Sequence, residues 1–391
     1  MRKISHWPPV LGAGSLAIAS LLVAAGGPAG AAVAAGPAPA AATPTVHETL
    51  IDPGRTSSYA EAINDRGDIV GTDDSGAFLY TPGGGVRVLT PPAGVDAILP
   101  TAINDRGDIL AQTFFEPDQV YLWRDGRWIF IADGEAAGLN QRGQLLVQVG
   151  TAATSFELWQ DGHSTAISAP DVTGVPSLTG GYLNQAGQVA FSSRDPDSPN
   201  PIEAWRWSGG RYTQLPALVR GASAQVEGLN DAGEVVGESG DAANPTEHVA
   251  VAWTHGAVRR LATPPATSDL NDSAAAVNDR GQVVGTNDTP DTPPEQALLW
   301  PGTAAPATLL APAYYGGARA INEAGQVVIN ALVASGLSGH SEALAWRDGQ
   351  LADLGAGTPI GQNESGQVIV NMNTGPSAPV QAAVFTIDWG T

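Results

Sequence analysis

Acid–base chemistry needs ionisable side chains that the fold can bring together, and this sequence offers one set of candidates. The set is Glu61, Glu227, Arg319 and Tyr182, which stand two or three residues before a recurring Asn. Two carboxylates that flank a glycosidic bond can protonate the leaving group and activate a nucleophile. The alternative is that these four side chains are solvated residues at the rim of the fold.

Calcium is the metal ion that acidic loops of this chain could bind, because it prefers oxygen ligands. Two loops carry closely spaced acids, Asp195 with Asp197 and Asp288 with Asp291. Their spacing matches no known calcium loop, so they are candidates by composition alone. No other cofactor is expected.

Several other chemistries find no support in the sequence. The absence of Cys excludes disulfides, zinc–thiolate sites and thiol catalysis. No serine-nucleophile elbow, phosphate loop or dinucleotide fingerprint stands in a fitting context. The histidines after residue 34 form no metal-binding spacing: His47, His163, His248, His255 and His340.

A short sequence motif recurs eight times, and the elements that it forms must position all of these residues. It reads INDRGDIVG at Ile63 to Gly71, and each copy keeps N-x-x-G before a Val/Ile/Leu-rich run. The repeated Asn residues are Asn64, Asn104, Asn140, Asn184, Asn230, Asn278, Asn322 and Asn363. This pattern predicts a hairpin whose Asn side chain accepts a hydrogen bond from the backbone of its own turn. Copies that read NQRGQ and NQAGQ have no carboxylate, so we expect the turn itself to be structural.

The spacing of the copies, 36 to 48 residues, is typical of β-propeller blades. Each repeat contains a second hairpin, such as EALAWRDGQLADL, so one repeat predicts four strands. An aromatic residue recurs in the third strand, for example Trp253 and Trp300, and we expect it to fill the layer between blades. The residue two before the Asn is small in every copy except at Tyr182.

The two ends of the repeat array are complementary. The last repeat stops at Trp389 without a fourth strand, whereas Thr45 to Pro53 resembles the fourth strands of other repeats. Pairing of these ends would cover two open sheet edges. The sequence therefore predicts an all-β fold, a closed eight-bladed β-propeller whose last blade is completed by the N-terminal strand.

The chain divides into three parts. Residues 1–34 have a basic start, an apolar run and small-residue cleavage sites, which predicts a signal peptide for the general secretory route. Residues 35–44 are an Ala/Pro-rich linker, and residues 45–391 are the single propeller domain. No second apolar run is long enough to span a membrane, so we expect a secreted, extracellular protein without membrane insertion after signal cleavage.

The net charge of the chain limits the classes of partner that it can bind. The formal net charge is −21 and becomes more negative when Arg2 and Lys3 leave with the signal peptide. Such a protein repels nucleic acid and anionic membranes. We expect a monomer whose partner is an extracellular glycan or protein.

The repeated A-I-N-D-x-G-x-V-V-G, followed by A-F-L-Y or A-L-L-W, resembles the HAF-repeat family of bacterial extracellular proteins. The resemblance covers Val46 to Trp389, and Gly76-Ala77-Phe78 and His248-Val249-Ala250 are the nearest matches to the naming triplet. It implies propeller-like repeats and an extracellular location, and it supplies no catalytic residue.

The loops suggest where a ligand would bind. Propeller geometry puts the short turns on one face and the long connections, such as Ser192 to Glu203 and Glu238 to His248, on the other. We therefore expect a binding scaffold that recognises a glycan or protein through its long-loop face. The alternative hypothesis is an extracellular glycan hydrolase or lyase with carboxylates at the channel mouth.

Overall fold

The computed structural model describes residues 43–115, 118–150, 154–170, 177–194, 202–240, 247–263, 271–287, 295–335, 338–373, 375 and 378–390. The signal peptide expected at 1–34 and all but the last two linker residues lie outside these ranges. The described residues form strands and turns without any helix, which confirms the all-β prediction. None of them forms a helix long and apolar enough to cross a membrane.

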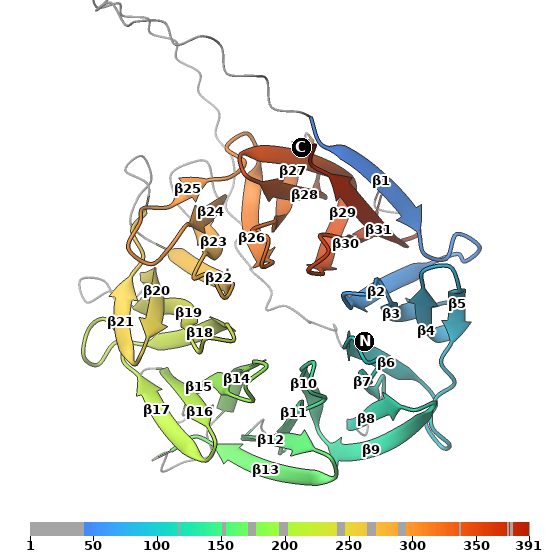
Figure 1. The fold of residues 1–391 in the computed structure, drawn as a ribbon, viewed down its shortest axis with the longest axis horizontal. Helices are drawn as coiled ribbons and strands as arrows, with labels where there is room; N and C mark the ends of the chain where they lie inside the picture. Colours follow the sequence, from blue (N-terminus) through green and yellow to red (C-terminus); the bar gives the residue numbers. More distant parts are fainter. Residues whose placement is uncertain are drawn as a thin grey trace, which may run out of the picture. The chain divides into compact units, whose positions relative to one another are not determined.

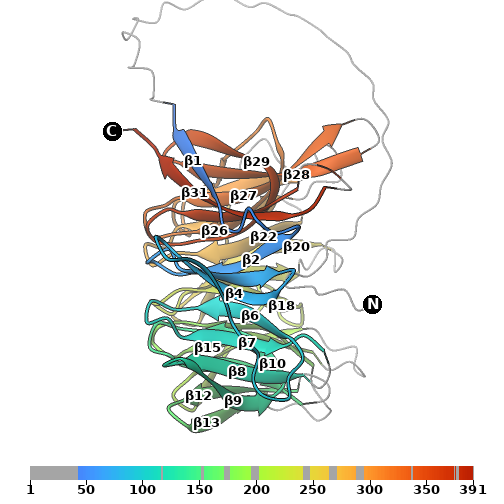
Figure 2. The same ribbon diagram turned by 90° about the vertical axis from the view of Figure 1, so that its right-hand side faces the viewer.

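Each of the first six repeats forms a sheet of four antiparallel strands, as predicted for a blade (Figure 1, Figure 2). The first strands, which precede the repeated Asn, are β2 (Ser58–Ile63), β6 (Ile98–Ile103), β10 (Glu135–Leu139), β14 (Ser177–Leu183), β18 (Ala224–Leu229), β22 (Asp272–Val277) and β26 (Tyr315–Ile321). The second strands are β3 (Ile69–Asp73), β7 (Ile109–Thr113), β11 (Leu145–Val149), β15 (Val189–Arg194), β19 (Val235–Gly240), β23 (Val283–Asn287), β27 (Val327–Ser335) and β30 (Val368–Met372).

The third strands are β4 (Gly76–Thr81), β8 (Gln119–Arg124), β12 (Ser155–Gln160), β16 (Glu203–Ser208), β20 (His248–Thr254), β24 (Gln296–Trp300), β28 (Ser338–Arg347) and β31 (Gln381–Asp388). The fourth strands are β5 (Gly85–Val88), β9 (Arg127–Asp133), β13 (His163–Ser168), β17 (Arg211–Leu215), β21 (Ala257–Arg260), β25 (Thr308–Leu309), β29 (Gln350–Gln362) and the N-terminal β1 (Thr45–Leu50). Figure 1 shows the first strands nearest the centre.

The strands form seven sheets, whereas the sequence predicts eight blades. Six sheets have four strands, and the seventh runs β1-β31-β30-β29-β28-β27-β26. The numbers differ because β29 changes partner along its length. Its residues up to Ala356 pair with β28, and those from Gly357 pair with β30. The outer strand of the seventh repeat thus continues directly into the inner strand of the eighth.

The N-terminal strand joins the end of the chain. Strand β1 pairs antiparallel with β31, from Thr45 opposite Asp388 to Leu50 opposite Ala383. This register confirms the prediction that the N-terminal strand completes the sheet of the last repeat.

The repeated Asn links each turn to the next repeat. The Oδ1 atom of Asn64 accepts hydrogen bonds from the backbone N–H groups of Arg66 at 3.1 Å and Asp68 at 2.8 Å. Its Nδ2 atom donates to the carbonyl oxygen of Asn104 at 3.0 Å. The same donation continues through Asn140, Asn184, Asn230, Asn278, Asn322 and Asn363, and the last one returns to Asn64.

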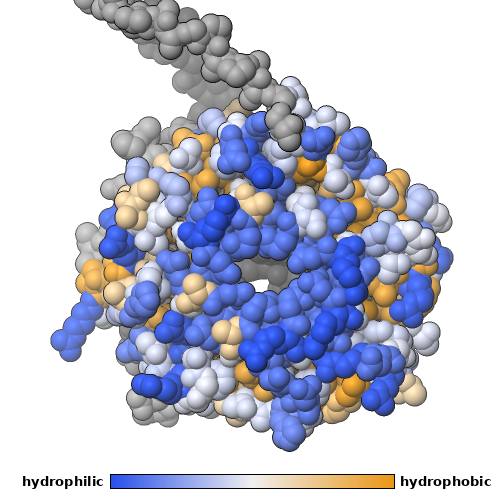
Figure 3. Space-filling model, viewed as in Figure 1, coloured by the Kyte–Doolittle hydropathy of each residue, from blue (hydrophilic) through white to orange (hydrophobic). Residues whose placement is uncertain are grey.

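The residue after each Asn forms a second circuit of hydrogen bonds. Its side-chain oxygen accepts from the backbone N–H of the equivalent residue in the preceding repeat, at 2.7 to 2.8 Å. The members are Asp65, Asp105, Gln141, Gln185, Asp231, Asp279, Glu323 and Glu364, which links back to Asp65. These six acids and two glutamines therefore hold the turns together, in agreement with a structural role. Figure 3 shows a hydrophilic surface around the central opening.

The hydrophobic core lies between neighbouring sheets. Trp253 packs with residues of both its own sheet and the preceding one, such as Ala190 and Val226. The buried indoles of Trp253 and Trp300 donate to the carbonyl oxygens of Pro216 and Ala262, each at 2.8 Å. These two aromatic residues fill the layers between sheets, as predicted.

Candidate functional site

Three of the four acid–base candidates lie where the register between the first and second strands of a sheet shifts. The pairing of the first with the second strand shifts at Glu61 in β2, at Glu227 in β18 and at Arg319 in β26. Such a β-bulge leaves one residue unpaired and re-aims its side chain. The bulge recurs in the other inner strands at Thr101, Ala137, Gly180 to Gly181, Ala275 and Ile360. Every inner strand thus has such an unpaired position, with two residues in β14, and among them Glu61, Glu227 and Arg319 carry a charged side chain.

Two of the candidates contact each other. The hydroxyl of Tyr182, on β14, donates to Oε2 of Glu227, on β18, at 3.2 Å. The amide of Gln225 donates to the other oxygen of Glu227 at 2.6 Å. Tyr182 also packs against the core between these two neighbouring sheets, where a small residue stands in the other repeats. The large side chain that breaks the repeat pattern therefore reaches an ionisable partner.

Glu61 and Arg319 lie apart from this pair. Strand β2 packs against β6 and β30, whereas β18 packs against β14 and β22, so Glu61 and Glu227 belong to sheets that do not adjoin. Among the described residues, the side chains of Glu61 and Arg319 have no hydrogen-bond or ion-pair partner. Burial raises the pKa of Glu61 from 4.5 to about 7. The structure brings Glu227 together with Tyr182 but not with Glu61.

A polar position that the sequence analysis missed recurs in the second strands, and in four of them its side chain bonds to the backbone of the next sheet. It lies eight residues after the repeated Asn, at Thr72, Gln112, Gln148, Ser192, Glu238, Thr286, Asn330 and Asn371. Gln148 donates to the carbonyl oxygen of Leu178 at 2.7 Å, and Ser192 accepts from the backbone N–H of Val226 at 2.9 Å. Counting from each Asn would have found this position. Glu238 is its only ionisable member.

Glu238 has a different partner from the neutral residues at this position. Its Oε2 atom lies 3.3 Å from Nε2 of His248, on β20. Together with Ser223, Gln225, Gly240, Ile202 and Glu247, these two residues line a cavity of about 150 Å³, called here the smaller cavity. We call Tyr182, Gln225, Glu227, Glu238 and His248 the acid cluster. Three of its residues, Tyr182, Glu227 and Glu238, differ in type from the residues at the same position of most other repeats.

The two carboxyls of the acid cluster influence each other. Burial raises the pKa of Glu227, and the hydrogen bonds from Gln225 and Tyr182 partly oppose that shift. Burial also raises the pKa of Glu238, with a further rise from the charge of Glu227 and an opposing effect of His248. Burial raises the pKa of Tyr182, so its hydroxyl keeps its proton. Such an arrangement favours the protonated carboxyls more than exposure to water would, and it can donate or accept hydrogen bonds.

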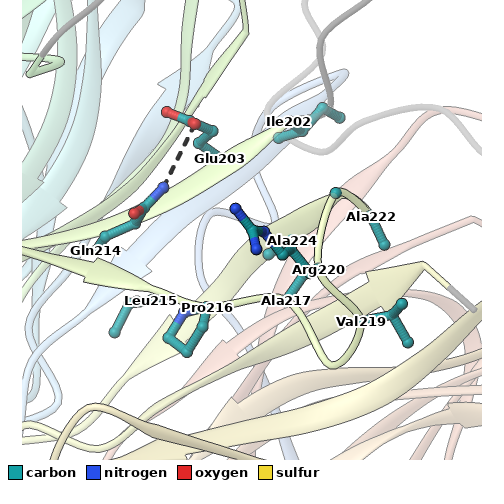
Figure 4. A pocket seen from close by; sticks show the side chains of 11 residues that line it. Ile202, Glu203, Gln214, Leu215, Pro216, Ala217, Val219, Arg220, Ala222 and Ala224 are labelled. Atoms are coloured by element: carbon teal, nitrogen blue, oxygen red, sulfur yellow. Dashed lines mark hydrogen bonds between the residues drawn. The ribbon is translucent and has the colours of Figure 1, made fainter. Parts of the chain in front are cut away.

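A larger cavity of about 320 Å³ adjoins the smaller one, and Ile202 lines both (Figure 4). Its walls come from the start of β16, the end of β17 and the segment Pro216 to Ala222 that leads to β18. First and third strands begin, and second and fourth strands end, on the face opposite the Asn turns. Both cavities therefore open on the long-loop face.

The calcium candidates Asp195, Asp197, Asp288 and Asp291 lie outside the described residues. Within the described ranges, no group of three His, Asp or Glu side chains is arranged to hold a metal ion.

Solved structures resemble this chain at low sequence identity. Dipeptidyl peptidase 4 of Porphyromonas gingivalis matches 84% of this chain and 57% of its own, with a TM-score of 0.55 and 9% identity. The β-propeller domain of the Trilobed protease from Pyrococcus furiosus matches 76% of this chain and 98% of its own, with a TM-score of 0.49 and 11% identity. Virginiamycin B lyase from Staphylococcus aureus matches 88% and 99%, with a TM-score of 0.43 and 9% identity.

The first of these likenesses shows a shared fold and nothing about activity, because its identity is so low. No protein-family model and no curated protein sequence matches the chain. The chain is a β-propeller by its own strand order and register.

Proposed function

We propose that this protein is a secreted, closed, eight-bladed β-propeller that works as a binding scaffold. Support for closure comes from the two hydrogen-bond circuits, in which the eighth turn bonds to the first. Support for eight blades comes from β29, whose two halves serve two four-stranded sets. Secretion and kinship with HAF-repeat proteins rest on the sequence patterns, as does the expected monomer.

The long-loop face between the fourth and fifth repeats is the proposed binding surface, for an extracellular glycan or protein. One observation carries this assignment: Tyr182, Glu227 and Glu238, which depart from the repeat, gather at the smaller cavity, which Glu238 lines and which adjoins the larger one. A regular scaffold that breaks its own pattern at one place usually does so for function. The smaller cavity offers hydroxyl, amide, carboxylate and imidazole groups that can bond to sugar hydroxyls or to a peptide.

The test is a binding screen of residues 35–391 against a glycan array and extracellular protein fractions, with and without calcium. For any ligand found, Glu238→Gln and His248→Gln should weaken binding about tenfold, the effect of losing one hydrogen bond to a charged group. The matched control is His163→Gln, an exposed histidine on the opposite face. Equal binding by all three variants would move the site away from the acid cluster.

A second candidate function is a glycan hydrolase or lyase that uses the acid cluster. The specific support is a pair of carboxyls with raised pKa values, one of them hydrogen-bonded to a tyrosine. Glycans bound in the screen would be assayed for new reducing or unsaturated ends. Cleavage that survives in both Glu227→Gln and Glu238→Gln would remove the cluster from this role.

A further inference from the structure

We propose that the larger cavity binds a carboxylate carried on a small apolar group, as at the C-terminus of a peptide that ends in an apolar residue. This inference rests on the proposed function in one respect, that ligands approach the long-loop face. It assigns a chemical class of ligand to a cavity that the acid cluster does not occupy.

The walls of the larger cavity select an apolar group. Leu215 and Ala224 are buried at its base, and Pro216, Ala217 and Val219 line the connection between β17 and β18 (Figure 4). Its volume of about 320 Å³ lies at the small end of the range for ligand pockets, roughly 300–1,000 Å³. A single apolar side chain would exchange contact with water for contact with these walls.

Arg220 provides the site for a carboxylate. Its side chain is exposed at the cavity, and it has no hydrogen-bond or ion-pair partner in the part of the chain that the structure describes. Figure 4 shows its guanidinium group pointing into the cavity, toward the side on which Glu203 and Gln214 lie. The planar guanidinium matches the two oxygens of a carboxylate. In a chain of formal net charge −21, an anionic ligand depends on such a local cation.

Glu203 further restricts the class of ligand that the larger cavity can bind. It lies on the same cavity and accepts a long hydrogen bond of 3.4 Å from the amide of Gln214. Its carboxylate repels a second anionic group and favours a hydrogen-bond donor. The last residue of a peptide carries both features, an amide N–H and one carboxylate. The preceding residues would continue past Ile202 toward the polar smaller cavity.

The test compares acids with their amides. Residues 35–391 would be titrated calorimetrically with N-acetyl-leucine, N-acetyl-leucinamide, and the acid and amide forms of N-acetyl-Gly-Ala-Leu. Both acids should bind at least tenfold more tightly than their amides. Arg220→Gln should remove that preference, Arg220→Lys should restore part of it, and the control Arg211→Gln, on β17 outside the cavity, should keep it.

The outcomes separate two sources of the carboxylate. A peptide acid that binds more tightly than N-acetyl-leucine supports a polypeptide C-terminus, whereas equal binding supports a small free acid. Equal binding of acids and amides, or an unchanged preference in Arg220→Gln with an unchanged unfolding midpoint, would overturn the proposal. So would the absence of binding by all four compounds, even if the screen for the proposed function finds a ligand.

Discussion

Asn363 and Asn64 are separated by 299 residues in sequence, yet the side-chain amide of Asn363 donates to the carbonyl oxygen of Asn64 at 2.9 Å. Both residues are buried. The same bond connects each repeated Asn to the next one along the chain, so this last bond joins the end of the array to its start. The closure that we propose therefore uses the interaction that also links consecutive repeats, and it can be tested at a single side chain.

Asn363→Ala should lower the free energy of unfolding by about 1–3 kcal/mol, because it leaves the buried carbonyl oxygen of Asn64 without this partner. Asn230→Ala, in the middle of the array, should have a similar effect. The measurement is chemical denaturation of both variants.

The control for this comparison is Ser365→Ala, which removes an exposed hydrogen bond to Asp65 and should change stability by less than about 0.5 kcal/mol. A much smaller effect at Asn363 than at Asn230 would contradict closure of the ring.

Removal of β1 should destabilise the protein and make it self-associate. The strand covers the outer edge of β31, and an uncovered edge offers unpaired backbone groups to another chain. We expect a protein that begins at Pro53 to unfold at a lower temperature and to form larger species in light scattering. A protein that begins at Ala42 keeps the strand and serves as the control. Equal melting of the two would show that β1 contributes nothing to stability.

The fold was largely predictable because each repeat carries its own turn chemistry. The Asn and Gly of INDRGDIVG specify a local hairpin, and local hydrogen bonds do not depend on distant parts of the chain. The pairing of β1 with β31 was predictable because an incomplete repeat at one end matched a spare strand at the other.

Contacts between repeats could not be predicted in the same way. The role of Gln148 and Ser192 depends on which backbone atoms of the next sheet lie within reach. The sequence places Glu61 and Glu227 at the same position of their repeats, but only the packing of the sheets shows that these two strands do not adjoin. The expectation of eight four-stranded blades also gave no sign that β29 runs on through Gly355 and Gly357 from the seventh repeat into the eighth.

Stability should fall with rising pH because of Glu61. Its pKa rises from 4.5 to about 7 on folding, so the folded state holds a proton that the unfolded chain releases. The resulting stability is complete below about pH 4.5 and is lost as the pH rises through about 7. Glu61→Gln cannot titrate and should reduce this slope in denaturation curves measured between pH 4.5 and 7.5. Glu48→Gln, on the exposed strand β1, controls for the change in charge and should leave the slope as it is. An unchanged slope in Glu61→Gln would refute the assignment.

Tyr182→Phe should raise the pKa of Glu227 further. The tyrosine hydroxyl donates to Oε2 of Glu227 and so stabilises the charged carboxylate, in opposition to burial. Without that hydrogen bond, burial raises the pKa of Glu227 further, and the protonated carboxyl is favoured. Tyr212→Phe is the matched control, because its hydroxyl bonds to the backbone of Ser168 instead. The measurement is an NMR titration of ¹³C-labelled Glu side chains, with Glu227 assigned by its Gln variant. A lowered or unchanged pKa of Glu227 in Tyr182→Phe would show that the hydrogen bond does not form in solution.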